Sequence, residues 1–251
     1  MEYEQFMKLL KSRRTIRRFK PDPFPDEYID KIIDASRYAM SGGNSQPWEF
    51  LVVKDPKIKE EIHKVYLDEF DMMYSLELQR IPRYRHPAFN VLPEEKDKAR
   101  DMLSNFIDAP AIIVVLEDPR KMFGAALCAR SDFETGSGSV LGVTMGHVEM
   151  VLSLAAASFG LGAGHVDILN HGPYKRILGI PDPVRLAVIV PIGYKAYEAG
   201  PPHRLPLEDL VHYEKYDMSK YMRNEDFLKY IDKIRALGRP GYRAAIGEGK
   251  A

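Results

Sequence analysis

The sequence predicts one mixed domain, of the α/β or α+β class, in which helices cover a central β-sheet. Short apolar runs, typical of buried strands, alternate along the chain with longer stretches that have helical periodicity. The chain has 251 residues, of which 45% are hydrophobic, so it can bury a full core in one domain with or without a tail. We find no internal repeat in the sequence.

Two amphipathic helices are expected first. Residues 3–12 carry apolar side chains at intervals of three and four positions. A second helix should begin at Pro25, because proline and the acidic residues that follow it suit a first helical turn. Its apolar stripe would contain Ile29, Ile32, Ile33, Ser36 and Met40.

Four strands and three further helical regions are expected in the rest of the chain. The strands are residues 48–53, 111–116, 165–168 and 185–194. The second is apolar throughout, which predicts burial on both faces, and Pro191 in the fourth predicts an edge position or a bulge. The helical regions are residues 57–108, 143–159 and 173–178, and the middle one is apolar enough for a core helix.

The composition excludes several classes of protein. Lysine and arginine together number 36, as do aspartate and glutamate, so no overall positive charge favours nucleic acid. No signal peptide is visible, and the apolar stretches around 111–116 and 148–161 are too short or too interrupted to span a bilayer. The single cysteine, Cys128, excludes an intrachain disulfide and a cysteine-based zinc site. We therefore expect a cytoplasmic protein with no metal site and no nucleic-acid or membrane partner.

An arginine cluster follows the first expected helix. Arg13, Arg14, Arg17 and Arg18, together with the hydroxyl group of Thr15, could direct several charge-assisted hydrogen bonds to one phosphate. The alternative is a solvated basic surface at a helix end, where cations are favoured in any case.

A glycine-containing turn joins the second helix to the first strand. Its sequence over residues 41–48 is Ser-Gly-Gly-Asn-Ser-Gln-Pro-Trp. The glycines would let the backbone approach a flat ligand closely, and Asn44 and Gln46 offer both donors and acceptors. Taken alone, the segment is equally well explained as an ordinary turn.

Taken together, these motifs resemble the nitroreductase-like FMN-dependent oxidoreductase family. Residues 154–162, 178–181, 192–194 and 204–208 continue the resemblance in the same order, so that it extends over about residues 9–212. The resemblance implies an α+β fold with a mostly antiparallel central sheet, in an intertwined homodimer that holds FMN at the subunit interface. Residues 1–212 would form the FMN-binding domain, with a lid insertion at about 67–98, and residues 213–251 an extension packed on the partner subunit.

Carried over position by position, the resemblance also implies the FMN contacts. The phosphate and the pyrimidine side of the ring would be bound by Arg13, Arg14, Thr15 and Arg17, with Arg204 as a second phosphate clamp. The partner subunit would supply Ser41, Gly42 and Asn44, and the backbone of Val166, Asp167 and Ile168 would lie against flavin N5 and O4. Because the flavin itself carries the redox chemistry, no catalytic side chain is assigned.

His165 and Asp167 depart from the family pattern. Two positions apart in an expected strand, they would share a face, so an imidazole and a carboxylate could meet near the flavin edge. There they could tune N5 or protonate a substrate. The alternative is a hydrogen-bonded pair with a structural role.

The lid would supply the substrate contacts. Met73, Tyr74 and Tyr84, together with His165, are candidates to contact a planar aromatic substrate, and Met72, His86 and Phe89 lie in the same segment. The alternative is a pair of helices whose aromatic residues pack the dimer.

The resulting hypothesis is an FMN-dependent NAD(P)H oxidoreductase that reduces nitroaromatic, quinone or related electron-poor aromatic acceptors by ping-pong hydride transfer. One alternative is a reductive dehalogenase of halogenated phenols. Another is a flavin-binding protein without NAD(P)H turnover.

Overall fold

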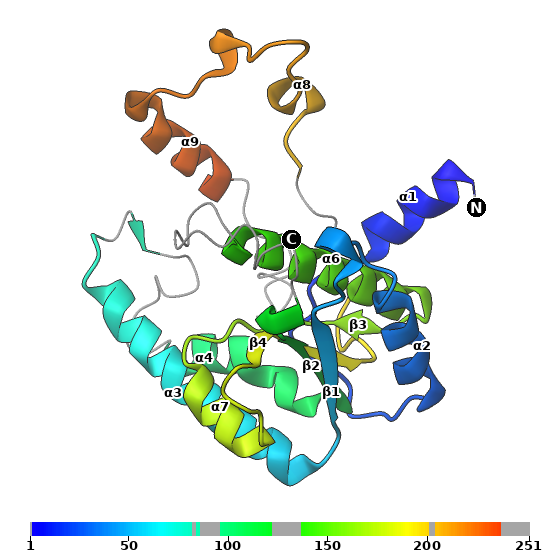
Figure 1. The fold of residues 1–251 in the computed structure, drawn as a ribbon. Coiled ribbons are helices and arrows are strands. Elements are labelled where there is room, and N and C mark those ends of the chain that lie inside the picture. Colours follow the sequence, from blue (N-terminus) through cyan, green and yellow to red (C-terminus); the bar gives the residue numbers. More distant parts are fainter. Residues whose placement is uncertain (1, 82–83, 86–95, 122–136, 201–203, 237–251) are drawn as a thin grey trace. The chain divides into compact units, whose positions relative to one another are not determined.

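The computed structural model describes residues 2–81, 84–85, 96–121, 137–200 and 204–236. Internal contacts divide the chain into two units, residues 1–197 and residues 198–251, and we describe each by itself. The elements of the first unit (Figure 1) are α1 (Tyr3–Ser12), α2 (Glu27–Ser36), η1 (Gly42–Asn44), β1 (Trp48–Val53), α3 (Pro56–Leu78), α4 (Lys96–Ser104), η4 (Asn105–Asp108), β2 (Ala111–Glu117), η5 (Pro119–Lys121), α6 (Ser137–Ser158), β3 (Gly162–Ala163), α7 (His171–Leu178) and β4 (Arg185–Gly193).

The four strands form one antiparallel sheet in the order β1-β2-β4-β3. Strand β2 lies between two partners, with Ile113 opposite Val52 of β1 and Val190 of β4. The helices and the antiparallel sheet confirm the expected α+β class, and β1 and β2 occupy the ranges that their apolar runs predicted, within one residue.

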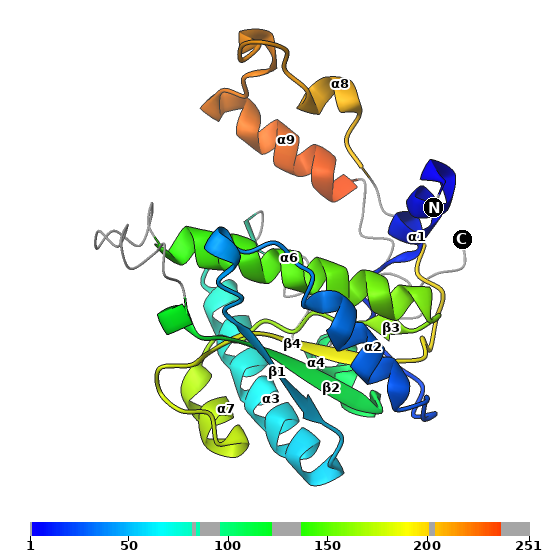
Figure 2. The same cartoon turned by 45° about the vertical axis from the view of Figure 1, so that its right-hand side comes forward.

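Helices cover both faces of the sheet, so the unit has three layers (Figure 2). Helices α2 and α6 lie on one face, and α3, α4 and α7 lie on the other. The core beside α2 and α6 includes Ile32, Ile113, Val115, Val148, Leu152 and Val190. Alternate residues of the strands, such as Ile112 and Ile189, are also fully buried, as expected for a sheet with two covered faces.

The helix boundaries follow local capping chemistry. Asp55 precedes α3, and its carboxylate accepts hydrogen bonds from the amides of Lys57 at 2.7 Å and Ile58 at 3.4 Å. Helix α7 ends at Leu178 and is capped by Gly179, whose φ of 66° is the left-handed conformation that glycine adopts without steric cost. Helix α2 ends at Ser36, so the expected continuation of its apolar stripe to Met40 is wrong, and Met40 is 70% exposed.

Strand β4 corrects the interpretation of Pro191. The strand is internal, between β2 and β3, and the irregularity in its pairing with β2 lies between Val188 and Leu186 rather than at the proline. The carbonyl of Pro191 accepts from the amide of Gly164 at 2.9 Å, just beyond the end of β3. In a strand the N and C=O of one residue face the same side, so the missing N–H of Pro191 costs no hydrogen bond to β2.

The third strand is also displaced from its expected position. Strand β3 is residues Gly162–Ala163, and within the expected range 165–168 only Val166 makes an isolated bridge, to Ile189. The apolar pattern of this region is too short to predict the ends of a strand. Gly162 and Gly164, which pack closely against Ile16, are not residues that indicate a strand.

Helix α6 begins earlier than its expected start at residue 143. One stretch in the described residues, Val140–Ser158, is long and apolar enough to cross a bilayer by length and composition alone, which corrects the expectation that no stretch would be. Here it packs on the sheet, and Val148, Leu152 and Ala156 of this stretch are fully buried.

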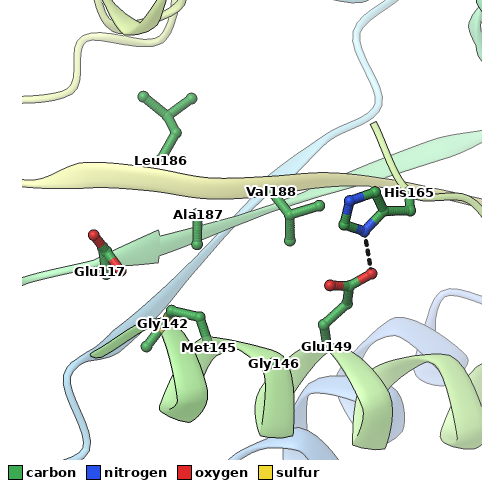
Figure 3. Close-up of a pocket in the computed structure, with 9 residues that line it drawn as sticks. All are labelled: Glu117, Gly142, Met145, Gly146, Glu149, His165, Leu186, Ala187 and Val188. Atoms are coloured by element: carbon green, nitrogen blue, oxygen red, sulfur yellow. Dashed lines mark hydrogen bonds and ion pairs between the residues drawn. The ribbon is translucent and has the colours of Figure 1, made fainter. Parts of the chain in front are cut away.

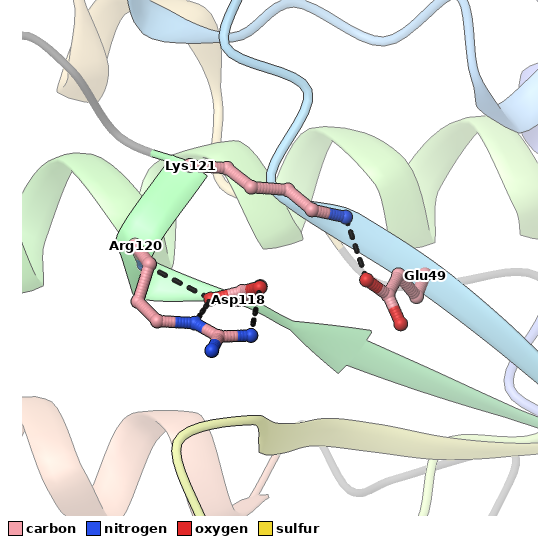
Figure 4. Close-up of polar contacts among 4 residues, drawn as sticks. All are labelled: Glu49, Asp118, Arg120 and Lys121. Atoms are coloured by element: carbon pink, nitrogen blue, oxygen red, sulfur yellow. Dashed lines mark hydrogen bonds and ion pairs between the residues drawn. The ribbon is translucent and has the colours of Figure 1, made fainter.

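Ionic contacts close the end of β2 (Figure 4). The Asp118 carboxylate accepts two hydrogen bonds of 2.8 Å from the guanidinium of Arg120, which lowers the pKa of Asp118 to about 2. Lys121 pairs with Glu49 of β1 at 2.6 Å. The Lys121–Glu49 pair joins the segment after β2 to β1, whereas the Asp118–Arg120 bonds lie within that segment.

The second unit contains α8 (Leu207–Leu210), η6 (Met218–Lys220) and α9 (Asn224–Ala236). Hydrogen bonds connect the residues after α8 to η6 and the residue before it. Lys220 Nζ donates to the carbonyl of Val211 at 2.6 Å, and the amide of Asp217 donates to Nδ1 of His212 at 3.0 Å. The domain boundary at residue 212 and the packing of the extension on a partner subunit stay predictions.

Candidate functional site

The arginine cluster is fixed beside β3 by backbone contacts. The amide of Ile16 donates to the carbonyl of Ala163 at 2.9 Å, and Thr15 forms a parallel bridge with Ala163. Two glycines make this close approach possible: a Cβ at Gly162 would lie 2.7 Å from Cγ1 of Ile16, and one at Gly164 would lie 2.9 Å from the carbonyl oxygen of Ile16. The structure therefore brings residues 13–17 and residues 162–168 together.

The cluster is suited to an anion. Arg13, Arg14, Thr15 and Arg17 are all partly buried. The Nε of Arg13 is buried and has no hydrogen-bond partner among the described residues. A buried donor without an acceptor costs free energy, and a phosphate oxygen would relieve that cost. The phosphate of FMN thus suits the residues that would hold it.

The turn before β1 has a strained backbone. Asn44 and Gln46 have positive φ angles of 53° and 47°, which are uncommon for residues other than glycine. The Oγ of Ser41 accepts from the amide of Gln46 at 3.1 Å, and the carbonyl of Met40 lies 3.3 Å from Nδ1 of His147 on α6. Such strain is typical of ligand-binding segments, which agrees with the expected role of Ser41, Gly42 and Asn44 without testing it.

The segment that was expected to face flavin N5 is held by β4 through only one of its three residues. The amide of Val166 donates to the carbonyl of Ile189 at 3.0 Å, and the amide of Ile189 donates back at 3.2 Å. Because successive residues of an extended chain point their amides to opposite sides, the N–H of Asp167 points away from β4. The N–H of Asp167 is thus a backbone donor that could reach a ligand, whereas that of Val166 is bonded to β4.

His165 lies between two carboxylates. Its Nε2 is 2.8 Å from Oδ1 of Asp167, as the shared-face argument predicted, and its Nδ1 contacts Oε1 of Glu149 on α6. The hydrogen bonds to Asp167 and Glu149 raise the pKa of His165 to about 10, and the bond to His165 lowers the pKa of Asp167. Sequence reasoning missed Glu149, although it is the only acidic residue in the apolar helix α6.

These residues border a cavity of about 310 Å³ between α6 and β4 (Figure 3). His165 and Glu149 form its polar end, and Met145, Ala187 and Val188 form an apolar wall (Figure 3). Glu117, at the end of β2, also lines the cavity, and burial raises its pKa.

A buried carboxylate anchors the far end of the same segment. Glu69 of α3 is only 6% exposed, and it accepts from the amide of Asn170 at 2.7 Å and from the hydroxyl of Tyr174 at 2.9 Å. Burial, followed by the charge of Glu69, raises the pKa of Tyr174. Residues 165–170 are thus fixed by α6 at one end and by α3 at the other.

The expected substrate residues of the lid are spread over different environments. Tyr74 is only 5% exposed and packs with Phe70 and Leu103, whereas Tyr84 is 45% exposed and Met73 is partly buried. His86 and Phe89 lie outside the described residues. Arg204 is exposed and belongs to the second unit, so its meeting with the arginine cluster stays a prediction.

The helix-covered antiparallel sheet defines an α+β protein, and the arginine cluster at the end of β3 is its candidate site for an anionic ligand. A model of the nitroreductase family matches residues 10–194. Because this match covers most of the chain, the protein belongs to the nitroreductase family, and it is an oxidoreductase.

Individual relatives share less than a third of their aligned residues with this chain. Iodotyrosine deiodinase 1 of Rattus norvegicus is 28% identical over 204 residues, which are 80% of this chain and 66% of that protein. The chain thus spans just under two thirds of that relative's length. An NADH dehydrogenase of Thermus thermophilus is 28% identical over 206 residues, 79% of this chain and 91% of that protein.

Solved structures share the fold. A crystal structure of oxidized iodotyrosine deiodinase bound to FMN and 3-iodo-L-tyrosine superposes with a TM-score of 0.62 at 23% identity, covering 84% of this chain and 99% of that one. A nitroreductase with bound FMN from Desulfitobacterium hafniense gives a TM-score of 0.58 at 23% identity, covering 86% of this chain and 100% of that one.

Proposed function

We propose that two copies of this chain bind FMN between them and use NAD(P)H to reduce electron-poor aromatic acceptors such as nitroaromatics or quinones. NAD(P)H would deliver a hydride and leave before the acceptor enters, which is a ping-pong order. The flavin would supply the redox chemistry, while the protein supplies binding, orientation and electrostatics.

One observation carries this proposal: the arginine cluster is joined to β3 through the Ile16–Ala163 hydrogen bond of 2.9 Å. That contact brings the arginine cluster, which we propose binds the phosphate, next to the segment 165–168. A ligand with a phosphate at one end and a flat ring at the other could therefore contact both. Flavin mononucleotide has this form, and solved relatives of the same fold contain it.

The dimer is supported by an apolar stripe on α6. Val140, Val143 and Met150 are 44%, 59% and 42% exposed in the single chain, at the spacing of one helix face. Covering such a face with a second copy would remove apolar surface from water. We expect sedimentation equilibrium to give twice the mass of one chain, and a monomer at micromolar concentration would contradict the dimer.

Cofactor binding is tested by titrating FMN into the flavin-free protein. We expect Arg13→Ala to weaken FMN binding by roughly 10- to 100-fold, because it removes a charge-assisted hydrogen bond. The matched control is Arg37→Ala, which removes an exposed guanidinium paired with Asp34 on α2. Equal affinities for Arg13→Ala and wild type would contradict the phosphate site.

Turnover is tested by mixing the FMN-loaded protein with NADH or NADPH without oxygen. Rapid loss of the flavin absorbance, followed by its recovery on adding a quinone or nitroaromatic, is the expected result. Bleaching by dithionite but not by either nicotinamide would contradict NAD(P)H turnover. It would favour a flavin-binding protein or a dehalogenase with another reductant.

A reductive dehalogenase of halogenated phenols is the second candidate, because iodotyrosine deiodinases are prominent among the relatives. In that reaction two electrons and a proton convert the carbon–halogen bond to carbon–hydrogen, and the halogen leaves as halide. Halide release from a halophenol by the reduced protein, measured with a halide electrode, would favour this candidate. The absence of release beside rapid quinone reduction would favour the first.

A further inference from the structure

The Glu149–His165–Asp167 contacts form a cluster that joins α6 to the segment 165–168. Asp167 belongs to the segment itself and contacts Nε2 of His165. Glu149 belongs to α6 and contacts Nδ1 of His165 (Figure 3). Both ring nitrogens of His165 face carboxylate oxygens. A neutral imidazole has only one N–H, so two such contacts require a doubly protonated ring.

The charges of the cluster do not cancel. Two carboxylates and one imidazolium leave one net negative charge. The other charged group that lines this cavity is Glu117, whose own cationic neighbour is Arg185 at 3.8 Å. The raised pKa of His165, about 10, keeps the imidazolium charged throughout the physiological range. Its proton is held too tightly for efficient acid–base exchange near pH 7.

We propose that Glu149, His165 and Asp167 are positioning residues whose net negative charge makes the site bind reduced FMN less tightly, relative to oxidised FMN, than it otherwise would. This inference rests on the proposed FMN site, in which Asp167 has the backbone donor that faces away from β4. Reduction adds negative charge to the flavin, so a fixed negative charge beside it opposes reduction. The cluster would thus counteract the arginine cluster, whose positive charge favours reduction.

The test compares substitutions that change the net charge of the Glu149–His165–Asp167 cluster in opposite directions. Glu149→Gln and Asp167→Asn each remove a negative charge, and His165→Gln removes the positive one. The control, Glu61→Gln, removes an exposed carboxylate on α3. For each protein, the dissociation constant of oxidised FMN is measured by fluorescence titration. The reduction potential of the bound flavin then gives the ratio of the constants for reduced and oxidised FMN.

We expect Glu149→Gln and Asp167→Asn to lower the ratio of the reduced to the oxidised constant by roughly three- to tenfold, from one charge at partial screening. Tenfold corresponds to about 30 mV for a two-electron couple. His165→Gln should raise the ratio, and Glu61→Gln should leave it unchanged. A purely structural clamp would shift all three cluster variants in one direction, and that outcome would overturn the proposal.

A second measurement tests the Glu149–His165–Asp167 cluster independently of FMN binding. In the flavin-free protein, nitrogen NMR of the His165 ring should show a doubly protonated imidazole from pH 6 to pH 8. Titration near pH 6.5 would overturn the cluster itself, even if His165→Gln does not fold. If wild-type protein shows the protonated ring but binds no FMN, the cluster is real. In that case the FMN site, and with it this inference, is wrong.

Discussion

Strand β2 and the segment 162–170 both lie beside β4, but different interactions hold them there. Six consecutive residues of β2, from Ala111 to Leu116, are buried apolar side chains, so the strand is held by apolar packing together with its backbone pairing to β1 and β4. The segment instead depends on two closely packed glycines, the His165 cluster and the carboxylate of Glu69. The comparison shows that the fold is set by apolar burial, whereas the candidate site is set by a few specific contacts.

The largest effect on stability is expected in the core. Ile113→Ala should lower the free energy of unfolding by about 2–5 kcal/mol, because Ile113 is fully buried between β1 and β4 and its removal leaves a cavity. Urea denaturation measures the loss. The control is Val52→Ala, directly opposite on β1 and 38% exposed, which should cost less. A marked loss of FMN affinity in folded Ile113→Ala would contradict the view that apolar burial sets the fold while other contacts set the candidate site.

A smaller loss of stability, with a clear loss of cofactor binding, is expected at Gly164. The Cβ of Gly164→Ala would lie 2.5 Å from Cγ of Pro191 and 2.9 Å from the carbonyl oxygen of Ile16, so the backbone beside the arginine cluster must shift. We expect a cost of about 1–3 kcal/mol and weaker FMN binding. Gly142→Ala is the stability control, since its Cβ would meet nothing within 4 Å. Unchanged FMN affinity in Gly164→Ala would show that the close contact between Gly164 and Ile16 does not position the arginine cluster.

The anchor at Glu69 should matter less. Tyr174→Phe removes one of two hydrogen bonds to a buried carboxylate, so we expect a loss of about 1–2 kcal/mol in thermal or urea unfolding. Tyr3→Phe, at a tyrosine that is 69% exposed, should change stability by less than about 0.5 kcal/mol. Equal effects of the two substitutions would contradict the role of Glu69.

The smallest effect is the pH dependence from His165. Its pKa is about 10 in the folded protein and near 6.5 when unfolded, so the folded state holds the proton more tightly. The resulting stability is complete below about pH 6.5 and is lost as the pH rises toward 10. The side chain is 37% exposed, so solvent screening should keep the effect at about 1 kcal/mol or less.

The measurement is the unfolding free energy of wild type minus that of His165→Gln, at several pH values. The difference should be largest near pH 6 and should shrink by pH 10. A difference that grows with pH would have the wrong sign for a protonated ring between two carboxylates.

The sequence predicted those parts of the molecule that depend on apolar burial. The helix at 3–12 followed from its apolar spacing, the strand at 111–116 from a short apolar run flanked by prolines, and the core helix expected at 143–159 from its long apolar stretch. The strand expected at 165–168 was wrong, because its pattern is short and its position is set by glycine packing against Ile16.

The site was only partly predictable for the same reason. His165 and Asp167 are two residues apart in the sequence, so a contact between them could be expected, although residues 165–168 form no regular strand. Glu149 is distant in sequence and joins them only in the folded chain, although a lone carboxylate in an apolar helix was a usable signal. Glu69 gave no such signal, because it stands among many charged residues of α3.

Glu69 also links the predicted lid to the site. The second half of α3 belongs to the region 67–98, and its buried carboxylate holds the amide of Asn170. If that half of the helix unwinds or slides, the Asn170 amide loses its acceptor and becomes free to exchange with solvent deuterium. The exchange rate of this one amide would therefore measure how often the second half of α3 opens.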